Sequence, residues 1–177
     1  MCRSVVWTIS MALVVVAASC SSEGPGESAS RAVAELRPTR GNETWGIVEF
    51  ETSGDRLLVS AHVDGLSPGA HGIHVHEVGD CSAPDATSAG PHFVFDVTTD
   101  REQSPIAGNL GELDASATGK AGLERALERA SLDGPRGIIG RSVVVHSRGN
   151  DPSQPPDGGG GARIACGVIE VVSGSSG

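Results

Sequence analysis

The sequence has few basic residues and no run of them. It contains 13 Lys and Arg residues against 22 Asp and Glu residues, and its formal net charge at pH 7 is −9. Nucleic-acid binding relies on clustered positive charge, so this composition argues against a nucleic-acid partner. An acidic chain also repels anions, so an anion-binding site would need a positive side chain placed locally.

Long apolar runs are absent as well, apart from residues 5–18. That stretch is shorter than the roughly 20 residues of a membrane-spanning helix. It follows Arg3 and leads to the small residues 17–19, which is the pattern of an export signal. We therefore expect a signal peptide over residues 1–19.

The small residues end at Cys20, and this arrangement resembles a bacterial lipoprotein signal, in which Cys20 would become the lipid-modified first residue. An ordinary secretory signal cut nearby is the alternative. Both interpretations predict an exported protein, and the first also predicts a lipid anchor in the membrane of a bacterial cell envelope. Residues 20–42, with their Ser, Gly, Glu and Ala, suggest a flexible tether.

Cysteine is scarce, and the four cysteines divide by position. Cys2 would be removed with the signal peptide, and Cys20 is the candidate for lipidation. Cys81 and Cys166 remain as an even pair in an oxidising compartment, where a disulfide is the expected state. A bridge closing a loop of this length would stabilise the fold by about 4 kcal/mol on loop-entropy grounds.

Residues 43–172 show the pattern of an all-β domain. Short β-type runs alternate with clusters of Gly, Pro, Asn and Asp, which favours a sandwich or a barrel. The clearest runs are 47–50, 57–63, 70–76, 142–146 and 163–172. We expect the final residues, 173–177, to form a disordered tail.

One segment conflicts with this pattern. Residues 122–130 have helical propensity and one opposite-charge pair at a helical spacing, Arg125 and Glu128. An all-β fold instead requires at least residues 123–127 to form a strand, with the sheet overriding local propensity. We favour the strand, with a helix as the alternative.

Two long segments, 77–111 and 147–162, show no regular pattern. Loops of this length are usually functional or mobile. Both lie next to histidines, so we expect two functional loops.

The sequence has only six histidines, and four of them adjoin these loops. His74 and His76 are two apart in a β-type run, so their side chains would share one face, with Val75 on the other. His92 and His146 lie beside the loops. Four imidazoles without thiolate or carboxylate suit copper, which can change its oxidation state. The pattern therefore predicts one redox-active copper site.

Residues 44–172 resemble the copper–zinc superoxide dismutase family. The shared motifs, in order, are GIVEF at 46–50, GIHVHEVGD at 72–80, SAGPHF at 88–93, IIGRSVVVH at 138–146 and GARIACGVI at 161–169. The resemblance implies an eight-stranded Greek-key β-barrel with two long functional loops. It also implies disproportionation of superoxide to O2 and H2O2 with one copper per chain.

Carried onto the matching positions, the resemblance implies catalytic roles for Arg163, as the residue that guides the anion, and for His92. The implied copper ligands are His74, His76, His92 and His146. The resemblance also implies a disulfide between Cys81 and Cys166. His71 matches a histidine that braces the end of the barrel, and we do not count it as a ligand. The family allows a homodimer.

The zinc site of the family is not matched. That site uses the bridging histidine, here His92, two further histidines in the following loop and an aspartate. No histidine lies between His92 and His146, and Ile106 and Asn109 occupy expected ligand positions. The aspartate that links the two metal sites falls on Asn150. We therefore predict that zinc is absent.

Without zinc, the second ring nitrogen of His92 would carry a proton and need an acceptor. The candidate carboxylates are Asp96, Asp100, Glu102 and Asp151, and the sequence does not choose between them. The first three would add to His92 only a weak, oxygen-rich set of zinc ligands.

Two other functions fit part of the pattern. A copper-binding envelope lipoprotein could buffer or deliver copper without turnover, but storage does not need a guiding Arg163. An adhesion-like sandwich with a vestigial site would be expected to lose copper ligands, and all four are present. Arg148, two residues after His146, is a second candidate for attracting the anion.

Overall fold

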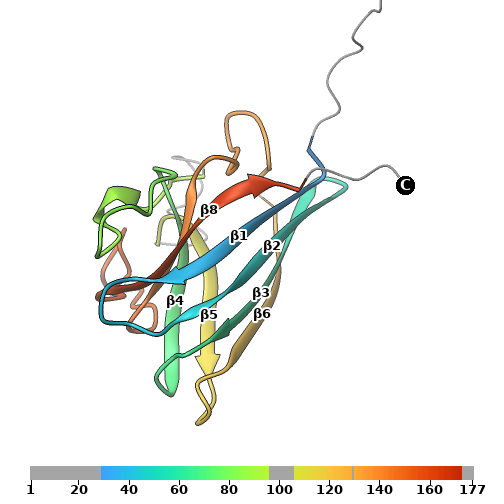
Figure 1. The fold of residues 1–177 in the computed structure, drawn as a ribbon. Coiled ribbons are helices and arrows are strands. Elements are labelled where there is room, and N and C mark those ends of the chain that lie inside the picture. The colour runs from blue at the N-terminus through green and yellow to red at the C-terminus, as the bar shows by residue number, and fades with distance from the viewer. Residues whose placement is uncertain (1–28, 96–105, 129, 173–177) are drawn as a thin grey trace, which may run out of the picture.

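The computed structural model describes residues 29–95, 106–128 and 130–172. In this part of the chain, eight strands form one curled sheet, and one short 3-10 helix lies outside it (Figure 1). The strands are β1 Arg31–Pro38, β2 Trp45–Ser53, β3 Arg56–Asp64, β4 Gly69–His76, β5 Asn109–Ala115, β6 Ala121–Leu127, β7 Ser142–His146 and β8 Arg163–Val171. The helix, η1, spans Thr87–Ala89.

The strands follow the order β5-β4-β7-β8-β1-β2-β3-β6, and all neighbours are antiparallel. The connections from β3 to β4 and from β6 to β7 pass between strands that are not neighbours, which makes the topology a Greek key. A short turn over residues 116–120 connects the two edge strands, and Leu123 of β6 lies next to Gly111 of β5. The sheet is therefore a nearly closed barrel, and the predicted all-β fold is confirmed.

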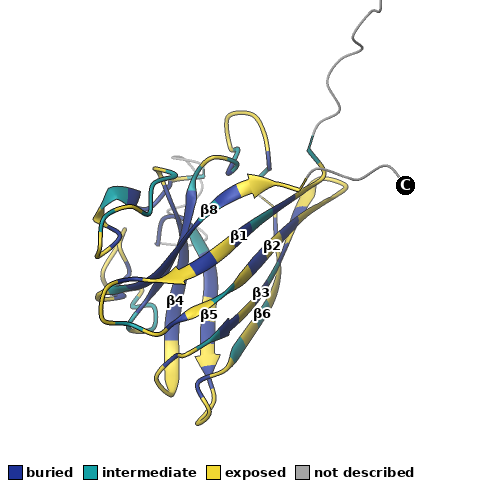
Figure 2. Cartoon of the chain, viewed as in Figure 1, coloured by how far each residue is buried: buried dark blue, intermediate teal, exposed yellow. Residues whose placement is uncertain are grey.

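Alternate residues of each strand fill the barrel interior (Figure 2). Val48 and Phe50 of β2 and Val59 and Ala61 of β3 are at most 2% exposed. The opposite faces of these strands are mostly exposed, which is the usual pattern for an antiparallel sheet with one solvated face.

The barrel begins earlier than predicted, because β1 lies inside the expected tether of residues 20–42. Ala32, Ala34 and Leu36 alternate as buried residues, and β1 pairs with both β2 and β8. Two of these three side chains are alanines, so the apolar alternation is weak in the sequence. The signal peptide, Cys20 and the tail lie outside the described residues.

Residues 123–127, for which we favoured a strand over a helix, lie in strand β6. Its backbone pairs with β3 from Ala121 to Leu127, and Leu127 is buried while Leu123 packs against the core. A ladder along the whole of β6 overrides the helical propensity of this segment. The expected irregular segment 77–111 also ends early, because β5 starts at Asn109 and buries Leu110 and Leu113.

The described parts of the two long loops cover the outer face of β4 and β7. Phe93 donates its backbone N–H to Val75, and Gly72 donates to Arg148. As a result, β4 is buried on both faces from His71 to its end. Within the described chain, no helix is long and apolar enough to span a bilayer.

The predicted disulfide between Cys81 and Cys166 is present. It joins the first loop to β8, and the two cysteines pack in a small apolar cluster with Ala86, Ala89 and Val144. This second cluster lies between the loop and the outer side of the barrel, so it attaches the loop to the sheet.

Candidate metal centre

The strand periodicity of β4 separates its core side chains from its histidines. Ile73 and Val75 point into the barrel core, while His74 and His76 point out of it toward the covering loops. In β7, Val145 enters the core and His146 follows a shift in the pairing register. Such irregularities often redirect a side chain next to a functional site.

His92 reaches the same place from the first loop. It forms an isolated bridge with His76, flanked by hydrogen bonds from Glu77 N to Pro91 O (2.9 Å) and from Phe93 N to Val75 O (2.9 Å). The loop therefore continues the sheet for a few residues and places His92 beside β4.

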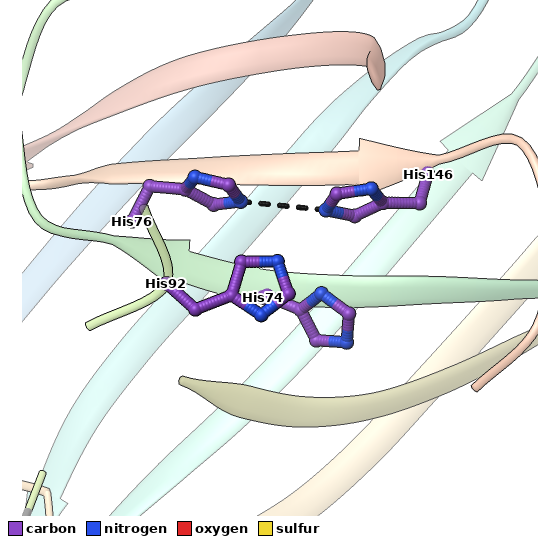
Figure 3. A group of neighbouring side chains, drawn as sticks. All are labelled: His74, His76, His92 and His146. Carbon is purple, nitrogen blue, oxygen red and sulfur yellow. Dashed lines mark hydrogen bonds between the residues drawn. The ribbon is translucent and has the colours of Figure 1, made fainter. Parts of the chain in front are cut away.

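The four imidazoles face one another (Figure 3). One nitrogen from each ring lies within 4.8 Å of the others, and all four residues are buried. Nε2 of His76 and Nε2 of His146 are 3.3 Å apart, and the ring centroids of His74 and His92 are 4.3 Å apart. A metal about 2 Å from each nitrogen would need only small movements of these rings.

Three of the rings are oriented by their other nitrogen. His76 Nδ1 donates to Gly90 O (2.9 Å) and His146 Nδ1 faces Gly161 O (3.4 Å). His74 Nε2 donates to the side-chain oxygen of Asn150 (2.8 Å). An imidazole that donates from one nitrogen presents a lone pair on the other, which is the state needed for metal binding.

Two further observations indicate that the four histidines suit a metal ion. Nδ1 of His74 is buried without a hydrogen-bond partner in the described structure, which is costly unless another group binds it. Burial, together with the neighbouring histidines, lowers the pKa of His74, His76 and His146 to about 3. The rings are therefore neutral at ordinary pH, as imidazole ligands must be.

His92 also has a buried Nδ1 without a hydrogen-bond partner in the described residues. Burial lowers the pKa of His92, while Asp157 and the backbone carbonyls of Pro156 and Ala107 oppose that shift. Among the predicted acceptors, the Asp151 carboxylate instead accepts from Ser153 and Gln154. The predicted acceptors at positions 96, 100 and 102 lie outside the described residues.

Arg163 stands at the entrance to the cluster. Its guanidinium donates to Ala86 O (2.7 Å) and Gly90 O (2.8 Å), both in the first loop. It lines a pocket of about 440 Å³ whose other walls are Pro91, His92, His146, Arg148, Asp157, Gly159, Gly160 and Gly161. Both predicted arginines, Arg163 and Arg148, therefore face the route to the histidines.

The model for the family described as copper/zinc superoxide dismutase (SODC) matches residues 44–169. The chain belongs to this family. A superoxide dismutase (Cu-Zn) of Onchocerca volvulus is 35% identical over 150 residues, covering 77% of this chain and 94% of that protein. An extracellular superoxide dismutase (Cu-Zn) of the same organism is 37% identical, covering 84% of this chain and 79% of that protein.

A solved structure, the crystal structure of the clock protein EA4, matches with a TM-score of 0.71 and 31% identity over 84% of this chain and 99% of that chain. The fold and the four-histidine cluster are thus those of a copper/zinc superoxide dismutase. His71 is not part of the cluster. It bridges Ser67 O and His146 O, which braces β4 against the end of β7.

Ile106 and Asn109, the two positions at which the family resemblance led us to expect zinc ligands, both have partners within the protein. Ile106 is 3% exposed and packs against Gly158, where an added Cβ would lie 2.8 Å from Ile106 Cδ1. The side-chain oxygen of Asn109 accepts from Gly111 N (2.9 Å) and lies 3.4 Å from Asn150 Nδ2. Apolar packing and amide hydrogen bonds therefore occupy this region.

Sequence reasoning missed the part played by the glycine run 158–161 and by Asp157. An added Cβ at Gly160 would lie 3.0 Å from His146, and one at Gly161 would lie 2.6 Å from Ser147 Oγ. The signal was visible as four consecutive glycines, but their contacts are with residues distant in the fold. No pattern in the sequence singles out Asp157.

The lowered histidine pKa values make the stability of the metal-free protein depend on pH. An unfolded histidine titrates near pH 6.5, so between about pH 3 and pH 6.5 the unfolded state binds more protons than the folded state. The free energy of unfolding should therefore decrease as pH falls through that window. Thermal unfolding of metal-free protein from pH 7.5 to pH 4 measures this, and a His146→Gln variant should show a shallower decrease. If the free energy of unfolding decreased equally with pH in the wild type and in the variant, the lowered pKa of His146 would be contradicted.

Proposed function

We propose that this protein is a superoxide dismutase that uses one copper ion held by His74, His76, His92 and His146. The observation that carries the proposal is the convergence of four neutral, buried imidazoles with Arg163 at a single pocket. Family membership supports the same activity, since the relatives carry that name.

Copper, when bound, supplies the one-electron chemistry by which two superoxide anions become O2 and H2O2, with uptake of two protons. The chain's own contribution begins with attraction of the anion. Arg163 keeps its positive charge at any ordinary pH and uses only part of its donor set on Ala86 and Gly90. Its charge and remaining N–H groups would therefore draw superoxide into the pocket and orient it.

His92 is the ligand best suited to handle a proton. It comes from a loop rather than a strand, and it lines the pocket. Asp157 and the backbone carbonyls of Pro156 and Ala107 oppose the lowering of its pKa by burial, which favours the protonated ring. We infer that His92 takes up a proton and passes it to the reduced product.

We also propose that the site works without zinc. The loop described between β4 and β5 adds no histidine to His92, and Ile106 and Asn109 are engaged in packing and hydrogen bonding. The four histidines are the only group of three or more metal-ligating side chains found among the described residues. Both observations support a copper-only member of the family.

Export is part of the proposal. Three of the similar proteins are named extracellular superoxide dismutases, and the disulfide suits an oxidising compartment. We propose that residues 1–19 are a signal peptide and that Cys20 carries a lipid that anchors the protein to a bacterial cell envelope. Mass spectrometry of the mature N-terminus tests this point.

The central test is superoxide consumption by copper-loaded protein. We expect a rate well above that of the same sample treated with a copper chelator, because metal-free histidines have no redox chemistry. A protein that binds copper tightly but consumes superoxide no faster than the chelated control would instead be a copper-buffering protein.

The role of Arg163 is tested by its salt dependence. Arg163→Ala should lower kcat/KM by about tenfold, within the range of electrostatic steering, and flatten its decrease with ionic strength. Asp157→Asn should raise kcat/KM at low ionic strength, since it removes a negative charge from the same pocket. The exposed Arg56 of β3 offers a control, as Arg56→Ala should change neither quantity. Unchanged kinetics in Arg163→Ala would remove this residue from the mechanism.

The absence of zinc is tested by metal content. After reconstitution with both ions, the protein should contain about one copper and no stoichiometric zinc per chain. The double variant Ile106→His and Asn109→Asp should bind zinc more tightly than the wild type, because it adds an imidazole and a carboxylate. Tight binding of a second equivalent as zinc to the wild type would refute the copper-only proposal.

A further inference from the structure

The side chain of Arg141 makes an unusual set of contacts just before β7. Its guanidinium carbon lies 3.4 Å from the centre of the Phe93 ring. Its Nη1 donates to Glu77 O (3.0 Å), and its Nε donates to Gly137 O (2.9 Å). One planar group thus stacks on an aromatic ring while it binds two backbone carbonyls at its edges.

These contacts join every segment that supplies a histidine to the cluster. Arg141 directly precedes β7, which ends in His146. Glu77 directly follows β4, which carries His74 and His76. Phe93 directly follows His92. A single side chain therefore contacts the residues that follow His76 and His92, from a position directly before the strand that carries His146.

The backbone of Arg141 is hydrogen bonded to the barrel. The backbone carbonyl of Arg141 accepts from Ile169 N (2.8 Å) in β8, and its N–H donates to Ile138 O (3.0 Å). Phe93 is 8% exposed and also meets Phe95 edge to face, with ring centroids 5.4 Å apart. The backbone of Arg141 is therefore held by the barrel, and its side chain stacks on the buried ring of Phe93.

His92 depends on this contact more than the other ligands do. The other three lie in strands β4 and β7, whereas His92 lies in a loop attached to β4 by the two backbone hydrogen bonds that flank it. An arginine stacked on an aromatic ring contributes up to about 2 kcal/mol when the contact is shielded from water. That is comparable with the flanking hydrogen bonds.

We propose that Arg141 is a positioning residue for His92. It fixes the segment 91–93 against the end of β4 by stacking on Phe93 while it binds Glu77 O. The proposal deepens the proposed function and rests on it only for the kinetic readout. Arg141 does not line the pocket that contains Arg163 and Arg148, so its action differs from attraction of the anion.

The test variant is Arg141→Lys, which keeps the charge but loses the planar stacking surface and one of the two carbonyl contacts. In metal-free protein, we expect faster hydrogen exchange of the Phe93 amide than in the wild type, with exchange of the Val144 amide in β7 unchanged. With Cu(II) bound, we expect altered hyperfine coupling in the electron paramagnetic resonance spectrum. Copper affinity should fall by about tenfold, as expected for loss of one stacked contact.

Phe93→Leu should reproduce these changes, and the double variant should be no worse than either single variant, because both remove one shared contact. Arg136→Lys is the matched control, since Arg136 is exposed in the loop before β7. If Arg141→Lys folds and its Phe93 exchange and Cu(II) spectrum equal those of the wild type, the proposal is wrong. Additive effects of the two substitutions would also overturn it.

The kinetic readout separates this proposal from the function itself. Arg141→Lys should lower kcat several-fold but leave the dependence of kcat/KM on ionic strength unchanged, unlike Arg163→Ala. If the wild type consumes no superoxide, the dismutase proposal fails, while the exchange and spectroscopic results still decide the role of Arg141.

Discussion

The structure depends on keeping four uncharged imidazoles buried together outside the main core of the barrel. Buried polar atoms must be hydrogen bonded or bound to another group, and here the surroundings satisfy only one nitrogen of His74, leaving the other to a metal. Burial keeps the rings neutral, so they do not repel one another as cations. A barrel wall alone cannot achieve this, because the outer face of a β-barrel is normally solvated. The two loops are needed to cover β4 and β7.

Each loop is attached to the barrel by groups that also serve the site. Gly90 O accepts from both His76 and Arg163, so the same carbonyl holds a proposed copper ligand and the arginine proposed to attract the anion. The disulfide to Cys166 holds the start of that loop on β8, and its far end pairs with β4. The glycines of the second loop allow a close approach to the site, because an added Cβ at Gly160 would lie only 3.0 Å from His146. The contacts that attach the loops over the histidines are therefore the same contacts that hold the side chains of the site.

Local patterns in the sequence were enough to predict features with a short period or a fixed chemistry. The spacing of His74 and His76 predicts a shared face in any strand, and β4 confirms it. The count of cysteines predicted the disulfide, and the family motifs narrowed the all-β pattern to an eight-stranded barrel. Weak patterns failed: β1 uses two alanines as core residues and was assigned to a tether. Contacts between distant segments could not be predicted either, since nothing near Arg141 indicates that its guanidinium will meet the ring of Phe93.

The surroundings of Ile106 and Asn109 show how this loop can be held without a second metal ion. In a copper-only protein, His92 gains no support from a second metal, so the polypeptide must hold its loop. Ile106 fills space against Gly158, and Asn150 connects His74 with Gly111 O through a neutral amide. Arg141 and Phe93 attach the loop from the opposite side of His92. These contacts are made by side chains and carbonyls alone, so they hold the loop that carries His92 without the help of a second metal ion.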